Sequence, residues 1–195
     1  MKKTILSVLC IAIMLLSLSA CVSQDPALDE LLQDLSEYAA VSAESYSLVI
    51  ETTERGGATI TEKYTVTFAD GVRNVTGRIE KINPFLVDGD TITAPDEYMT
   101  VTESSFTVSA SESDAFALPA FKFSQDTLSE ITTDLTSFPY VLTADVTSPS
   151  AFMGTEVAGS NMKLTAEYVL GSLYAIQLRY KTENDNTVTV TYTYN

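Results

Sequence analysis

TVTVTYTY, residues 187–194, decides the fold class of this chain. Its β-branched and aromatic residues are typical of strands. Val188, Val190, Tyr192 and Tyr194 alternate strictly with threonines, so one face of the strand is expected to be buried and the other solvated. This pattern predicts an antiparallel sheet with one face against a core and one face in water.

The residues before this stretch repeat the pattern. Alternating apolar residues predict strands over 163–170 and 174–180. Gly171-Ser172 and the polar run 183–186 supply the turns between strands. The C-terminal part is therefore expected to form a three-stranded meander.

A second meander is predicted nearer the N-terminus. Residues 45–51 and 59–68 alternate apolar and polar side chains, and Asp70-Gly71 is a strong hairpin signal. Residues 72–82 should then return antiparallel.

A helix is predicted before the first meander. Asp25 followed by Pro26 is typical of an N-cap with proline at the first helical position. Apolar residues then recur three and four apart until about Val41. This apolar stripe is expected to pack against a sheet. It consists of Leu28, Leu31, Leu32, Leu35, Tyr38 and Ala39.

The centre of the chain is less regular. Residues 88–90, Asp-Gly-Asp, predict a turn, residues 98–110 one or two strands, and residues 111–114 a polar loop. A strand is predicted again over 140–147.

A second, short helix is predicted to start near Ser124 or Asp126 and to stop before Pro139. Leu128, Ile131 and Leu135 would form its apolar face. Together with the two meanders, this helix predicts an α+β fold.

The N-terminus has the pattern of an export signal. Lys2 and Lys3 precede an apolar run that ends in Leu-Ser-Ala-Cys, which resembles the lipobox of bacterial lipoproteins. The expected organisation is a signal peptide over 1–20, a lipidated Cys21 with a short tether over 21–24, and one domain over 25–195. The apolar run is shorter than the roughly 20 residues of a membrane-spanning helix, which is the competing interpretation. The sequence thus predicts a protein anchored by lipid to the outer face of a bacterial membrane.

Charge excludes one class of partner. Without Lys2 and Lys3 the chain has nine basic and 26 acidic residues, a net charge of −17. Phosphate backbones repel a protein this acidic, and its basic residues form no run, so nucleic-acid binding is not expected.

The chemistry available to the mature chain is narrow. The sequence has no histidine. Its two cysteines are Cys10, which is removed with the signal, and Cys21, which the lipid occupies, so imidazole and thiolate catalysis are excluded. The nearest carboxylate clusters are Asp88 with Asp90 and Asp96 with Glu97, and solvated acids of an acidic surface explain them better than acid–base catalysis. Residues 88–90 also lack the spacing of an EF-hand. We expect no enzyme activity, no metal site and no cofactor.

The order of elements resembles the LolA/LolB-like group of bacterial envelope proteins, together with lipoproteins of the LppX and LprG kind. The resemblance covers nearly all of residues 25–195 at the level of element order and rests on no motif beyond the lipobox. It implies a strongly curved, incompletely closed, mainly antiparallel sheet packed on the N-terminal helix and a second short helix. It also implies a cavity between sheet and helices that accepts acyl chains.

The apolar strand faces supply the candidate ligand site. Either these side chains pack wholly against the helices or some of them line a cavity, because two short helices cover only part of a large sheet. A non-catalytic lipoprotein that binds or carries a hydrophobic molecule such as a lipid is the leading expectation. The alternative is a structural or interaction lipoprotein with a filled core, whose protein partner is unknown. The candidate lining residues are Tyr64, Val66, Phe68, Phe121, Phe123, Ile176, Leu178, Tyr180, Val190 and Tyr192.

Overall fold

The computed structural model describes residues 26–41, 45–55, 57–69, 72–82, 86–88, 91–93, 99–106 and 116–194. Two helices are present in this part of the chain, α2 (Pro26–Val41) and α3 (Pro149–Met153). The strands are β1 (Ser45–Thr53), β2 (Thr59–Ala69), β3 (Val72–Ile82), β4 (Leu86–Asp88), β5 (Thr91–Thr93), β6 (Met99–Phe106), β7 (Leu128–Asp134), β8 (Tyr140–Val146), β9 (Ser160–Val169), β10 (Ser172–Lys181) and β11 (Thr187–Tyr194).

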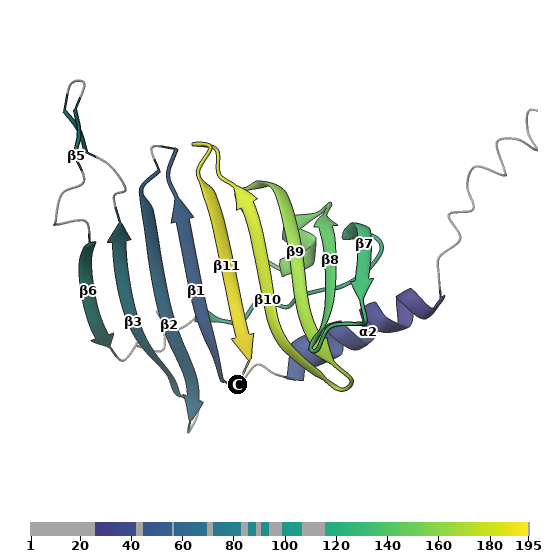
Figure 1. The fold of residues 1–195 in the computed structure, drawn as a ribbon. Helices are drawn as coiled ribbons and strands as arrows, with labels where there is room; N and C mark the ends of the chain where they lie inside the picture. The colour runs from purple at the N-terminus through teal and green to yellow at the C-terminus, as the bar shows by residue number, and fades with distance from the viewer. Residues whose placement is uncertain are drawn as a thin grey trace, which may run out of the picture.

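Nine of the strands form one open antiparallel sheet in the order β6-β3-β2-β1-β11-β10-β9-β8-β7 (Figure 1). The strands β6 and β7 are its two edges, so the sheet does not close. The remaining pair, β4 and β5, forms a separate hairpin. The predicted α+β class with a curved, open sheet and two helices is confirmed.

Both predicted meanders are present and are joined directly. The first consists of β1, β2 and β3, and the second of β9, β10 and β11. The first and last strands of the described chain pair over their full length, from Tyr46 opposite Tyr194 to Thr53 opposite Thr187. This pairing makes one continuous sheet of the two meanders.

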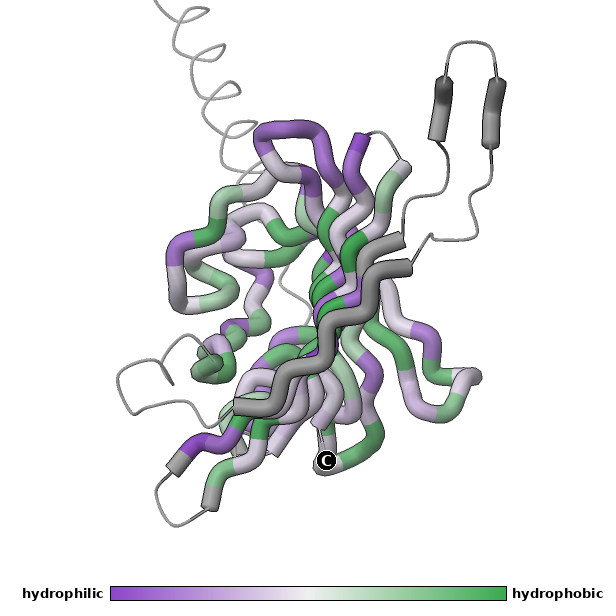
Figure 2. Tube along the Cα trace, turned by 90° about the vertical axis from the view of Figure 1, so that its left-hand side faces the viewer, coloured by the Kyte–Doolittle hydropathy of each residue, from purple (hydrophilic) through white to green (hydrophobic). Residues whose placement is uncertain are grey.

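The strict alternation of β11 is borne out. Val188, Val190, Tyr192 and Tyr194 are buried, whereas the intervening threonines are partly or fully exposed. We call the buried side the inner face and the threonine-bearing side the outer face. Figure 2 shows the sheet edge-on with the helical side of the molecule on its left.

Helix α2 covers part of the inner face. It runs from Pro26 to Val41 as predicted, and Leu32, Leu35 and Ala39 of its apolar stripe are buried. It crosses behind the β7 to β10 side of the sheet, whereas no described helix lies behind β6, β3 and β2 (Figure 1).

The prediction of a helix between Ser124 and Pro139 is wrong, because strand β7 occupies this segment. Its pairing with β8 is interrupted by a β-bulge between Ser129 and Thr132, where Glu130 has a φ of 51°. In a regular strand, residues three apart face opposite sides, but the extra residue of a bulge brings Leu128 and Ile131 to the same core. The bulge thus produces the apolar spacing of a helix within a strand.

The second helix is instead α3, five residues long. It begins with Pro149 after Ser148 and ends at Gly154, which has a left-handed φ of 67°. These are ordinary start and stop signals, but a single turn is too short to produce a periodic apolar pattern. Its Phe152 is fully buried.

The other central predictions have mixed outcomes. The region 98–110 contains one strand, β6, and the strand predicted over 140–147 is β8. The polar loop 111–114, and Gly89 and Asp90 of the predicted turn, lie outside the described residues.

Candidate functional site

The predicted lining residues divide into a buried and an accessible group. Phe68 is 49% exposed, and Tyr64 and Tyr180 are partly buried. The other seven belong to the hydrophobic core, where they pack against each other and against the helices: Val66, Phe121, Phe123, Ile176, Leu178, Val190 and Tyr192.

Phe121 and Phe123 come from residues 116–127, which we call the crossing segment. The ring of Phe121 meets that of Tyr192 on the sheet with centroids 5.3 Å apart, and the ring of Phe123 meets that of Phe152 in α3 at the same distance. At its start, Phe116 packs edge-on against Tyr64 at 5.2 Å. The crossing segment therefore covers part of the inner face. From the sequence alone, this part could equally have lined a cavity.

Polar contacts hold the crossing segment to α2 and to the sheet. The Phe123 backbone N–H donates to the Ser36 hydroxyl at 2.9 Å, and the Gln125 amide donates to the Asp29 carboxylate at 2.7 Å. The Tyr46 hydroxyl donates to the Phe116 carbonyl. Each contact satisfies a group that burial would otherwise leave unpaired.

Two other buried tyrosines, unlike Tyr46, have hydroxyls without a hydrogen-bond partner among the described residues. These are Tyr168 on β9 and Tyr194 on β11, whose hydroxyls are buried. Both residues lie on the inner face, near the ends of strands that run in the same direction, beside the start of β10. An unsatisfied buried hydroxyl costs about 1–3 kcal/mol, so two of them at one end of a core require an explanation.

Both phenols are protonated at neutral pH, and burial moves the pKa of each further above the ordinary value of about 10. Burial raises the pKa of Tyr168, with a smaller contribution from Tyr140, and it raises the pKa of Tyr194, with smaller contributions from Tyr192 and Tyr46. Both hydroxyls are therefore hydrogen-bond donors at neutral pH, available to a carbonyl, ester or hydroxyl oxygen.

A groove of about 420 Å³ runs between α2 and the crossing segment. Phe123 is the single predicted lining residue in it. Its walls combine apolar and polar side chains: Asp29, Leu32, Gln33, Ser36, Glu37, Ala40, Phe123 and Ser124.

A second hollow of about 250 Å³ includes the Tyr180 side chain and three basic residues, Lys163, Arg179 and Lys181. Lys163 pairs with Asp145, and Lys181 pairs with Asp185 at 2.7 Å. Sequence reasoning did not single out this hollow, because its basic residues come from two strands and are not contiguous.

The inner face of β2 and β3 is covered unevenly, because Val66 and Val75 are buried there while side chains nearer the strand ends are exposed. Phe68 on β2 and Ile79 on β3 are 49% and 37% exposed. Tyr64 on β2 is partly buried, and its hydroxyl donates to the Glu62 carboxylate at 2.6 Å. Of the predicted lining, Phe68 and Tyr64 are therefore accessible on this side of the sheet.

The described ranges also bear on membrane spans and metal sites. No helix there is long and apolar enough to cross a membrane. The described residues also contain no group of three or more acidic, cysteine or histidine side chains placed to hold a metal ion. Cys21, the predicted lipid site, lies outside them.

Comparisons with known proteins leave the family open. No protein-family model matches the chain, and no curated protein matches it. Among solved structures, a redesigned β-barrel matches at 13% identity over 81% of this chain and 96% of the other, with a TM-score of 0.21. A superposition that poor does not bear on fold or function.

Proposed function

We propose that this protein is a non-catalytic lipoprotein, anchored through Cys21 to the outer face of a bacterial membrane, that binds or carries a hydrophobic ligand such as a lipid. In this proposal the chain is a LolA/LolB-like protein. The export signal and lipobox support the anchor, and the open sheet with helices on one face suits an apolar ligand.

The observation that carries the ligand proposal is the pair of unpartnered hydroxyls at Tyr168 and Tyr194. Both are inside an apolar core, where an acyl chain would be stabilised by about 0.8 kcal/mol per buried methylene. Both donate, so they match the ester, carboxyl or hydroxyl oxygen at the polar end of a lipid. A ligand with one apolar and one oxygen-rich end would satisfy both features together.

Side chains fill the centre of the inner face, and this limits the routes by which a ligand could enter. Phe121 and Phe123 occupy the space over Tyr192 and Phe152, so an acyl chain there requires the crossing segment to move. The contacts of this segment with α2 are hydrogen bonds of Ser36 and Asp29, which a movement would exchange for water. The exposed side chains of Phe68 on β2 and Ile79 on β3 offer apolar surface that a ligand could contact without such a movement.

The test is native mass spectrometry of the mature protein, extracted from its membrane in mild detergent and followed by organic extraction. We expect one lipid per protein, and we expect the double variant Tyr168→Phe, Tyr194→Phe to retain about tenfold less of it, which corresponds to about 0.7 kcal/mol for each of the two lost hydrogen bonds. The control is Tyr174→Phe, which changes an exposed phenol on the same sheet. A protein free of lipid, with no uptake of added phospholipid, would refute ligand binding.

The packed core also favours a second candidate, an interaction lipoprotein. Seven of the ten predicted lining side chains are buried in the core, and the sheet ends in two unpaired edge strands, β6 and β7. Such an edge can pair with an extended segment of another protein. A lipid-free mass together with a co-purifying protein that is lost when β7 carries Thr132→Pro would select this candidate.

A further inference from the structure

Large apolar side chains are exposed at two turns of the sheet. In the β7–β8 turn, Leu135 is 62% and Phe138 is 82% exposed, and in the β9–β10 turn Leu170 is 88% exposed. Nearby, Tyr174 is 45% exposed. Single exposed apolar residues are common on soluble proteins, but a group of them at one end of a sheet is a feature of binding surfaces.

The two turns are neighbours in space. Tyr140, directly after the first turn, pairs with Tyr168, directly before the second, and their rings meet with centroids 5.7 Å apart. We call Leu135, Phe138 and Leu170 with their two turns the apolar tip.

The apolar tip carries no charge in a strongly acidic protein. Residues 135–144 and 168–178 contain no acidic or basic side chain, although the chain has 37 charged residues. Two carboxylates border these ranges. Asp134 lies at the base of the first turn and accepts hydrogen bonds from the backbone and hydroxyl of Thr136, and Glu167 is exposed on β9 opposite Val141. The tip is therefore a place where this acidic molecule can approach an apolar phase without burying a charge.

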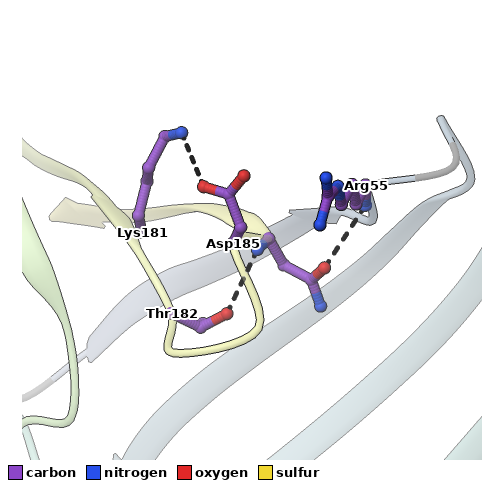
Figure 3. Close-up of polar contacts among 5 residues, drawn as sticks. Arg55, Lys181, Thr182 and Asp185 are labelled. Carbon is purple, nitrogen blue, oxygen red and sulfur yellow. Dashed lines mark hydrogen bonds and ion pairs between the residues drawn. The ribbon is translucent and has the colours of Figure 1, made fainter.

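The opposite end of the same sheet is polar. The β1–β2 turn contains Glu54 and Arg55, and the β10–β11 turn is flanked by the Lys181–Asp185 ion pair. The two turns are linked there by the Arg55 backbone N–H, which donates to the Asn186 side chain at 3.3 Å (Figure 3). Figure 2 shows hydrophilic residues gathered at the upper loops. The β7–β8 and β9–β10 turns are thus uncharged, whereas the two turns described at the opposite end carry charges. Arg73 lies at the same end as the apolar tip, but on β3 across the sheet.

We infer that the apolar tip inserts into the interface of a lipid bilayer, so that the domain touches the membrane that holds it. This inference rests on the proposed lipid anchor. Four residues lie between Cys21 and Pro26, and the five Cα-to-Cα steps keep the start of α2 within about 17 Å of the lipidated residue. Helix α2 lies across the lower half of the molecule in Figure 1, the half that contains the β9–β10 turn. Tyr140 and Tyr174, with one apolar and one polar end, suit the level of the headgroups.

The chain has no tryptophan, so one introduced tryptophan is a unique probe. Full-length protein purified from bacterial membranes, with either Phe138→Trp or Leu170→Trp, is reconstituted in phosphatidylcholine vesicles with or without bromine on the acyl chains. We expect a blue-shifted emission and at least a twofold loss of fluorescence with brominated lipid. The control Asn184→Trp, in the polar β10–β11 turn, should keep its emission. All three positions are exposed, so the fold should tolerate the changes.

Equal emission of the two tip probes in both kinds of vesicle would overturn the inference. So would protection of the tip probes from bromine by a co-purifying protein or a second copy, detected by chemical cross-linking. The mass of the N-terminal peptide tests the anchor separately. Unquenched tip probes on a protein with lipidated Cys21 would refute insertion of the tip and leave the anchor standing. Quenched probes on a protein without lipid on Cys21 would refute the anchor and leave insertion of the tip standing.

Discussion

The backbone of Gly159 lies against the ring of Tyr180, so closely that a Cβ atom at position 159 would fall 2.5 Å from Cδ2 and 3.3 Å from Cγ of that ring. Both atoms belong to the part of the ring nearest the backbone, which cannot swing away easily. The contact lies where a register shift interrupts the pairing of β9 with β10, between Arg179 and Lys181. The glycine therefore allows the segment before β9 to cross a half-buried aromatic ring.

We expect Gly159→Ala to lower the free energy of unfolding by about 1–3 kcal/mol, because the tyrosine ring must leave its rotamer or the backbone must shift. The measurement is the urea midpoint followed by circular dichroism. In a Tyr180→Ala background the same change should cost much less, since the clashing ring is gone. An equal cost in both backgrounds would assign the effect to the backbone rather than to the ring.

The partnerless hydroxyls of Tyr168 and Tyr194 make a prediction about stability. In ligand-free protein, Tyr194→Phe or Tyr168→Phe should raise the free energy of unfolding by about 1 kcal/mol, because each removes a buried polar group that has no described partner. Tyr46→Phe is the matched control and should lower it by about 1 kcal/mol, since it removes the hydrogen bond to the Phe116 carbonyl. Destabilisation by all three changes would mean that the hydroxyls of Tyr168 and Tyr194 are already hydrogen-bonded in the ligand-free protein.

The tyrosines also predict a loss of stability in alkali. Burial raises the pKa of Tyr46, Tyr168, Tyr180, Tyr192 and Tyr194, and burial together with the hydrogen bond to Glu62 raises that of Tyr64 to about 12. The unfolded chain releases these protons near pH 10 and the folded chain holds them, so the stabilisation is complete below about pH 10 and falls as the pH rises further.

The check is the urea midpoint between pH 8 and 12, compared with the absorbance of tyrosinate at 295 nm. We expect the midpoint to fall above about pH 10 and the buried tyrosines to ionise together with unfolding. Complete ionisation near pH 10 with an unchanged midpoint would contradict the packing of this core.

The bulge in β7 predicts a stabilising substitution. Glu130 has a left-handed φ of 51° and its side chain is exposed. A residue other than glycine in this conformation costs about 1 kcal/mol, so Glu130→Gly should raise the free energy of unfolding by roughly 0.5–1 kcal/mol. Glu167→Gly, at an exposed position on β9, should instead lower it by a similar amount. Destabilisation by Glu130→Gly would show that the side chain contributes more than the strain.

The same bulge explains where prediction from sequence was wrong. The residues Leu128, Ile131 and Leu135 have helical spacing, and Ser124 before them has the chemistry of a helix start. In the structure, Ser124 closes a turn instead, where its carbonyl accepts from the backbone of Thr127 and Leu128. Leu135 lies at an exposed turn, so the three apolar residues do not share a face. Local spacing cannot separate a helix from a bulged strand, because pairing with β8 decides between them.

The candidate site was predictable in part. Alternation along β2, β10 and β11 predicted that eight of the ten proposed residues lie on the apolar side of their strands. In the structure, this side is the inner face of the sheet. Whether those side chains meet solvent, a ligand or other side chains depends on the crossing segment, which lacks a periodic pattern. The sequence also could not predict the unpaired hydroxyls of Tyr168 and Tyr194, since the lack of a partner depends on how the core packs.

The sequence by itself determined the helix from Pro26 to Val41, the two meanders, and the burial of one face of each strand, because propensity, turn residues and alternation act over a few neighbouring residues. It also predicts an export signal over residues 1–20 and a lipid site at Cys21, which stay predictions. The tertiary structure alone decided that β1 pairs with β11, that the crossing segment packs on Tyr192, and that two uncharged turns meet at one end. These are contacts between residues far apart in the chain, and their free energy depends on which surfaces the whole sheet leaves uncovered.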